Sequence, residues 1–156
     1  MFDGVLLGIG MGALLDVIVI HGILQWHHLM SDLVPPTTVE ALERNLTADA
    51  VFQLIAWVLT AVAIALLWRR SRRADAGASV SDRRLLGSVL IGWAAFNLLD
   101  GVVVHYALRW HHVRGGSDAL VSDIAFFAVS VLVAFAGWML VGRAAGSQNA
   151  GSETAR

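Results

Sequence analysis

The chain has 156 residues, of which 57% are hydrophobic and 15% charged, and its mean hydropathy is +0.68. Soluble domains carry about 25% charged residues, so this composition indicates a small integral membrane protein. A net charge of −1 with arginine as the only basic residue type excludes a nucleic-acid-binding protein, and the absence of cysteine excludes disulfides, thiolate metal sites and covalently attached c-type haem.

Four apolar segments follow one another along the chain, at about residues 5–29, 50–68, 85–108 and 124–141. A bilayer core of about 30 Å requires roughly 20 helical residues, which each segment provides. Lipid offers backbone polar groups no partner, and the chain lacks the alternating strands of a barrel, so the segments are expected to be helices. The first has no basic residues before it and is too long for a cleavable signal peptide. We predict an all-α, four-helix membrane bundle in contact with the lipid bilayer, forming one domain over residues 1–145.

The connection at 69–84 carries six arginines, which predicts that it lies in the cytoplasm together with both termini. Eight arginines are then inside and three outside. In the first outer loop, Thr37 and Glu40 have the spacing of a capping box and predict a short surface helix ending near Asn45. The tail at 146–156 has no periodicity and is expected to be disordered.

The chain contains an internal repeat, with one copy at 4–70 and the other at 85–145. A shift of 84 residues aligns Asp16 with Asp100 and His21 with His105, and it also aligns the Trp-His-His segments at 26–28 and 110–112. Each copy is one helical hairpin, so we expect two parallel repeats related by an axis along the membrane normal. Gly4, Gly8 and Gly12 form a small-residue stripe for packing within the bundle or for a homodimer.

All six histidines fall in two copies of the pattern Asp-x4-His-x5-His-His. An aspartate in a membrane span is costly unless it is paired, protonated or bound to metal, so the pattern predicts a functional site. Imidazole and carboxylate together suit Zn, Fe, Mn, Ni or Cu(II). We predict one or two transition-metal ions in the outer half of the bundle. The candidate ligands are Asp16, His21, His27, His28, Asp49, Asp100, His105, His111, His112 and Asp123.

Helical geometry constrains how these ligands can meet. His21 and His28 are about 10 Å apart along a helix axis, so ligands are expected to converge from different helices. Asp16 and His21, five residues apart, would align only across a π-type turn. By depth, the deeper tier holds Asp16 and His21 with their repeat partners, and the outer tier holds the His-His pairs with Asp49 and Asp123.

Other interpretations use the same residues. His21 and His105 could be axial ligands of haem in an electron carrier. Asp16–His105 and Asp100–His21 could be buried ion pairs of a purely structural protein, or the Asp and His side chains could relay protons. Asp49 and Asp123 could instead cap helices. No nucleophile stands beside a base and no phosphate-binding loop follows a strand, so the sequence assigns no catalytic residue.

The segments DVIVIHGILQWHH and DGVVVHYALRWHH, ending in two adjacent histidines, resemble those of a family of bacterial membrane proteins named domain of unknown function two-two-four-three. The resemblance covers roughly 4–142. It implies four transmembrane helices in the bacterial inner membrane and carries no activity with it. This chain departs from the family pattern at Val17, where the motif usually has glycine, and at Gln53, where a histidine is frequent.

Overall fold

The chain folds into four long helices in a computed structural model that describes residues 1–73 and 81–153, with side chains as far as Arg143. The first comprises α1 (Phe2–Asp16) and the π-helix η1 (Val17–Leu24), and the second is α2 (Val39–Arg73). The third comprises α3 (Asp82–Asp100) and the π-helix η2 (Gly101–Leu108). A short 3-10 turn, η3 (Gly116–Asp118), precedes α4 (Ala119–Glu153). The described residues contain no strand, which confirms the all-α prediction.

All four helices are long and apolar enough to cross a membrane, with mean hydropathies of 1.6 to 2.5 in their most apolar windows. The outer surface carries large apolar side chains, among them Leu54, Trp57 and Leu132, which are 60–66% exposed. Such a surface is stable in lipid and would aggregate in water. The predicted four-helix membrane protein is confirmed.

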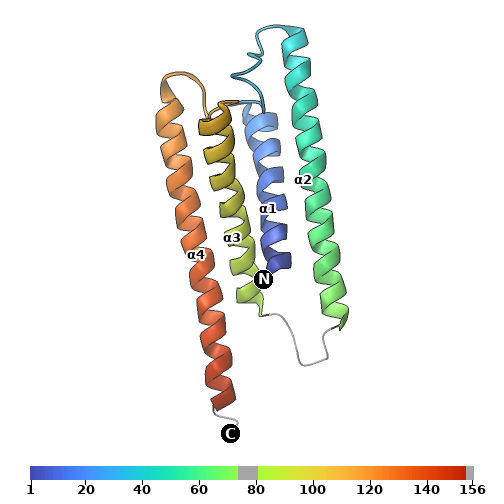
Figure 1. Ribbon diagram of the computed structural model, residues 1–156, viewed down its shortest axis with the longest axis vertical. Helices are drawn as coiled ribbons and strands as arrows, with labels where there is room; N and C mark the ends of the chain where they lie inside the picture. Colours follow the sequence, from blue (N-terminus) through green and yellow to red (C-terminus); the bar gives the residue numbers. More distant parts are fainter. Residues whose placement is uncertain (74–80, 154–156) are drawn as a thin grey trace.

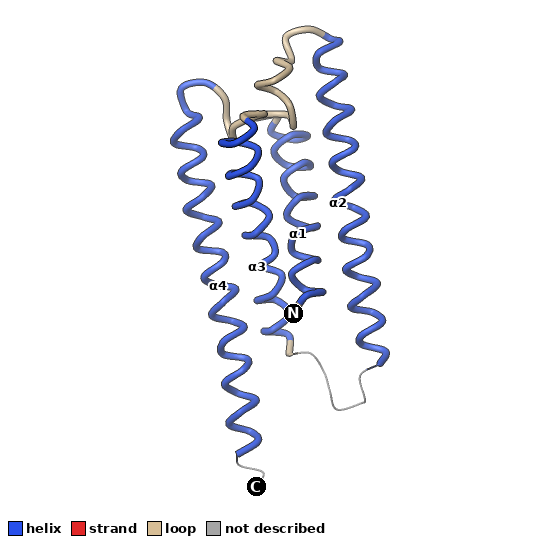
Figure 2. The backbone as a smooth tube through the Cα atoms, viewed as in Figure 1, coloured by secondary structure: helices blue, strands red, loops and turns tan. Residues whose placement is uncertain are grey.

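Helices α1 and α3 form the centre of the bundle, with α2 packed against α1 and α4 against α3 (Figures 1 and 2). The backbones of α1 and α3 meet at two glycines. A Cβ added at Gly8 would clash with the carbonyl oxygen of Val89, and a Cβ added at Gly92 would clash with the carbonyl oxygen of Val5. Small residues at a contact let helices approach closely in lipid.

The stripe of Gly4, Gly8 and Gly12 faces α3, where added Cβ atoms would meet Ser88, Val89 and Trp93. This contact is the packing role predicted for the stripe. The alternative of a homodimer through these glycines is not supported, because the face that a second copy would need is covered by the chain's own third helix.

Three predicted boundaries differ from the structure. The first helix ends at Leu24 rather than Leu29, because the chain reverses at Gln25. The short surface helix near Asn45 is the first part of α2, whose first turn is capped by Thr38 Oγ1 accepting from the amide of Ala41, one residue later than the predicted cap. Helix α4 continues to Glu153, so 146–153 is helical where a disordered tail was predicted. Extending a formed helix through good helix formers costs little per residue, which explains the early start of α2.

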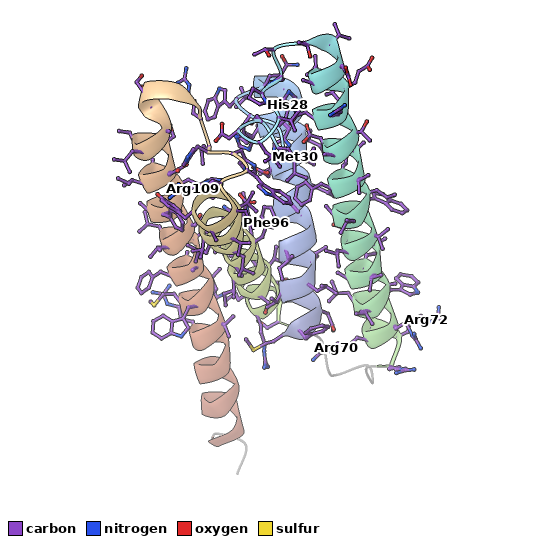
Figure 3. The ribbon with its side chains drawn as sticks, turned by 45° about the horizontal axis from the view of Figure 1, so that its top comes forward. His28, Met30, Arg70, Arg72, Phe96 and Arg109 are labelled. Carbon is purple, nitrogen blue, oxygen red and sulfur yellow. The ribbon has the colours of Figure 1, made fainter. Side chains whose placement is uncertain are left out.

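The arginine-rich connection lies at the end of the bundle opposite the histidine motifs. Figure 3 shows Arg70 and Arg72 at one end of α2, and His28 and Met30 in the loop at the other end. Arg70 lies 3.4 Å from Asp3 of the first helix and so ties these two helices together at the arginine end. The middle of the connection, 74–80, and Arg156 lie outside the described residues.

Candidate metal centre

The π-helices bring each aspartate next to a histidine five positions later. In η1, the Nε2 atom of His21 lies 3.4 Å from a carboxylate oxygen of Asp16. In η2, the Nε2 atom of His105 lies 3.2 Å from Asp100. An α-helix aligns residues three or four apart, whereas a π-helix aligns residues five apart. The two segments therefore take the π-type geometry that the Asp-x4-His spacing requires for contact.

A left-handed residue then turns the chain back over each π-helix. Gln25 has φ 51° and Arg109 has φ 54°, and the next amides, of Trp26 and Trp110, donate to carbonyls six residues earlier at 3.1 and 3.0 Å. Left-handed caps commonly end helices and redirect the chain. The turn brings His27 back towards η1 and His111 back towards η2.

Two groups of three ligands result, and in each group the candidate ligand atoms lie within 4.8 Å of one another. One group is Asp16, His21 and His27; the other is Asp100, His105 and His111. Within each group the ligands come from a single helix and the turn after it. The two groups meet at the stacked rings of His27 and His111, so side chains from different helices do converge on one cluster, as expected. The predicted division into an outer and a deeper tier is wrong for His27 and His111, because the turn brings these two histidines next to the residues of the deeper tier.

Backbone carbonyls fix the tautomer of two of these histidines. The Nδ1 atom of His27 donates to the carbonyl oxygen of Val113 at 2.9 Å, and that of His111 donates to the carbonyl of Leu29 at 3.0 Å. A carbonyl oxygen can only accept, so Nδ1 carries the proton and Nε2 presents its lone pair in the neutral ring. Burial, together with the nearby rings of His111 and His21, lowers the pKa of His27 from 6.5 to about 2 and keeps that lone pair free.

Several ring nitrogens of the cluster are buried without a hydrogen bond, although the Nε2 atoms of His21 and His111 lie 3.4 and 3.8 Å from carboxylate oxygens of Asp16 and Asp100. Within residues 1–73 and 81–143, the buried Nε2 atoms of His21, His27 and His111 have no hydrogen-bond partner. All three rings are at most 6% exposed. A buried polar atom without a partner is costly and calls for an explanation such as a bound ion.

Asp49 and Asp123 lie behind the two groups. Asp49 accepts from the Nδ1 atoms of His21 at 2.8 Å and His28 at 2.7 Å, and from the amide of Leu29 at 2.8 Å. Neither carboxylate caps its own helix, because Asp49 and Asp123 both lie past the first turn of α2 and α4 and accept from the loop amides of Leu29 and Val113, so the alternative that they cap helix starts is wrong. Because α2 begins at Val39, Asp49 is more than two turns from the end of the helix that it was expected to cap.

Asp123 has the equivalent position in the second half. It accepts hydrogen bonds from the Nδ1 atom of His112 at 2.6 Å and from the amide of Val113 at 3.0 Å. It also lies 3.2 Å from Nδ1 of His105, but these two atoms are not aligned for a hydrogen bond. Four of the predicted ligands, Asp49, Asp123, His28 and His112, thus stand one layer outside the two groups of three. In this layer they orient the groups' histidines or one another.

The imidazole rings form one continuous cluster. His27 and His111 stack face to face, with ring centroids 4.1 Å apart and an interplanar angle of 8°. His21 packs edge-on against His27 at 4.6 Å, and His105 packs edge-on against His111 at 4.9 Å. Phe52 and Phe126 stack on the outer faces of His21 and His105 and close the cluster with apolar rings.

The ion pairs of the structural interpretation are not formed across the halves. Asp16 pairs with His21 and Asp100 with His105, in place of the exchanged pairs Asp16–His105 and Asp100–His21. The buried Asp–His contacts between helices are those of His21 with Asp49 and of His105 with Asp123, one within each half.

The sequence did not point to one buried side chain and two main-chain groups that support the candidate site. Asn45, which is fully buried, accepts from the amide of Met30 at 3.3 Å and donates to the carbonyls of Val34 and Ala41 at 2.7 and 3.0 Å. It holds the loop that carries His27. A lone asparagine in an otherwise helical segment was the available signal. The carbonyls of Leu29 and Val113 have no signature in the sequence.

Four membrane-spanning helices around a buried cluster of carboxylates and imidazoles define an integral membrane protein whose polar site could hold metal. The family described as "Predicted membrane protein (DUF2243)" matches residues 3–144. The chain belongs to this family, as its histidine motifs implied. No curated protein and no solved structure matches the chain.

Proposed function

We propose that this protein binds transition-metal ions, one at each of two sites formed by two histidines and one aspartate. The first site is Asp16, His21 and His27, and the second is Asp100, His105 and His111. The observation that carries the proposal is the convergence of three ligand atoms within 4.8 Å in each group, with buried Nε2 atoms that lack partners among the described residues.

The ligand set suits a functional ion. Two imidazoles and one carboxylate bind Zn, Fe, Mn, Ni or Cu(II), and bond lengths of about 2.0–2.2 Å require only small movements from the present positions. Three protein ligands leave at least one position for water or another molecule, which is typical of catalytic and exchangeable ions rather than of closed structural sites. The hydrogen bonds from Nδ1 to Asp49, Leu29 and Val113 are the kind that orient metal-bound histidines.

The geometry favours this proposal over haem. A porphyrin held between His21 and His105 would need the space that the stacked rings of His27 and His111 occupy, since each of these rings contacts both axial candidates at 4.6–6.4 Å. The Nε2 atom of His27 also supports metal over a purely structural role, because the described residues offer this buried atom no hydrogen-bond partner.

The proposal includes a location. By the arginine distribution, both termini and the arginine-rich end face the cytoplasm, and the metal sites lie towards the outer face of a bacterial inner membrane. Two copies of one helical hairpin would give the two sites their matched ligands. Equal contacts 84 residues apart, such as His27 with Val113 and His111 with Leu29, support this arrangement.

Elemental analysis of protein purified without a histidine tag or chelator tests the proposal. We expect two transition-metal ions per chain in the wild type and none in the His27→Ala/His111→Ala double variant. The Asp118→Asn variant is the control and should retain both ions, because the Asp118 side chain is 59% exposed and is not a proposed ligand. Less than about half an equivalent in the folded wild type would contradict the proposal, and a Soret band in the same sample would favour haem.

A further inference from the structure

The first metal site is hydrogen-bonded to the second through a single loop residue. Leu29 donates its amide to Asp49, which accepts from His21 of the first site. The carbonyl of the same residue accepts from Nδ1 of His111 of the second site. One continuous chain of hydrogen bonds therefore runs from the π-helix of one half to the turn histidine of the other.

The reverse connection exists as well. Val113 donates its amide to Asp123, which lies 3.2 Å from Nδ1 of His105 of the second site. Its carbonyl accepts from Nδ1 of His27 of the first site. The two chains cross at the stacked rings of His27 and His111, whose centroids are 4.1 Å apart. Neither site can adjust its turn histidine without moving a residue that holds the other site.

From this reciprocity, and resting on the proposed function above, we propose that the two sites form one coupled dinuclear centre, in which an ion at one site raises the affinity of the other through Leu29 and Val113. An ion on Nε2 of His27 withdraws electrons from the ring and strengthens the Nδ1 bond to Val113. Val113 is then held in the position in which its amide binds Asp123, beside His105.

The charge of the cluster favours two ions over one. Four carboxylates have oxygens 2.8–3.4 Å from a ring nitrogen of His21 or His105: Asp16, Asp49, Asp100 and Asp123. In their ionised form they carry four negative charges, which two divalent cations balance and one does not. Uncompensated charge is costly in a low-dielectric interior, so charge balance favours two ions in the fully loaded centre, while the coupling between them rests on the hydrogen bonds through Leu29 and Val113.

Titration with Cu²⁺ in detergent, followed by electron paramagnetic resonance, tests the coupling. At one Cu²⁺ per wild-type chain, coupled binding predicts a mixture of empty and doubly loaded chains, whose copper pairs give a dipolar-broadened spectrum. The Asp100→Asn and Asp16→Asn variants each lose a carboxylate from one site only and should give the spectrum of isolated ions. The second ion should bind the wild type about 5- to 150-fold more tightly than the single ion binds either variant, the same factor for both because coupling is reciprocal.

The outcomes separate this inference from the proposed function. If isolated-ion spectra persist up to one Cu²⁺ per chain and pairs form only beyond it, the sites exist and the coupling is overturned. If the wild type does not bind Cu²⁺ more tightly than the His27→Ala/His111→Ala double variant, the proposed function itself fails. The wild-type titration decides the question even if an aspartate variant does not fold.

Discussion

Replacing Asp49 with asparagine changes the support of the first metal site without removing a proposed ligand. The carboxylate accepts three hydrogen bonds, from His21, His28 and the amide of Leu29, at 2.7–2.8 Å. An amide has one accepting oxygen, and its NH₂ group would face a donor at the remaining position. The substitution therefore removes the negative charge behind His21 and converts at least one charge-assisted hydrogen bond into a donor–donor contact.

The size of the effect follows from the bond that is lost. A hydrogen bond to a charged group contributes about 1.5–3 kcal/mol. Each 1.4 kcal/mol is a factor of ten in affinity, so the dissociation constant of the site should rise about 10- to 100-fold. The same range is typical when a group that orients a metal-bound histidine is removed.

The assay is a competition titration against a coloured chelator, with Asp49→Asn placed in the Asp100→Asn background so that only the first site is complete. The reference is the Asp100→Asn single variant, and Asp118→Asn in the same background controls for an exposed carboxylate-to-amide change. An unchanged dissociation constant would refute the role assigned to Asp49. Complete loss of binding in a folded protein would make Asp49 a direct ligand, which also contradicts this assignment.

Three further substitutions test how the fold positions the site. Gly8→Ala should lower the free energy of unfolding by about 1–3 kcal/mol, because the added Cβ would clash with Val89. Gly142→Ala is the control and should leave the free energy of unfolding unchanged, because the space around its Cβ is open. Thermal unfolding of both variants in detergent measures the difference. Gln25→Ile places a β-branched residue at φ 51°, which should lower the free energy of unfolding by about 1–2 kcal/mol and reduce the metal content. Gln25→Gly accommodates this φ and should retain the metal. Equal metal content in the two variants would contradict the role of the turn. Asn45→Leu leaves the amide of Met30 and the carbonyl of Val34 unpaired and should destabilise the protein by about 1–3 kcal/mol, and an unchanged melting temperature would show that the loop is held elsewhere.

The spans could be predicted because lipid imposes a single rule, that about 20 consecutive apolar residues form a helix. Their ends could not, because a helix stops where its hydrogen bonds stop rather than where hydropathy falls. α2 begins at Val39, well before the apolar residues start, and the first helix stops at Leu24 although apolar residues continue.

The site residues could be found because the pattern Asp-x4-His-x5-His-His occurs twice in one chain. Their grouping could not be found, since it depends on two backbone features with no clear side-chain signal. The five-residue spacing from Asp16 to His21 was compatible with a π-helix but did not require one. A left-handed conformation is uncommon for residues such as Gln25 and Arg109, so nothing in their identity predicted the turns that bring His27 and His111 back.

An X-ray absorption spectrum of the metal-loaded wild type tests the central claim most directly, because it reports the ligands of the ion itself. Two histidines and one carboxylate at each site predict a shell of nitrogen and oxygen atoms at about 2.0–2.2 Å, with the outer-shell scattering of two imidazoles per ion. A shell of oxygen atoms without imidazole scattering would contradict the proposed ligands.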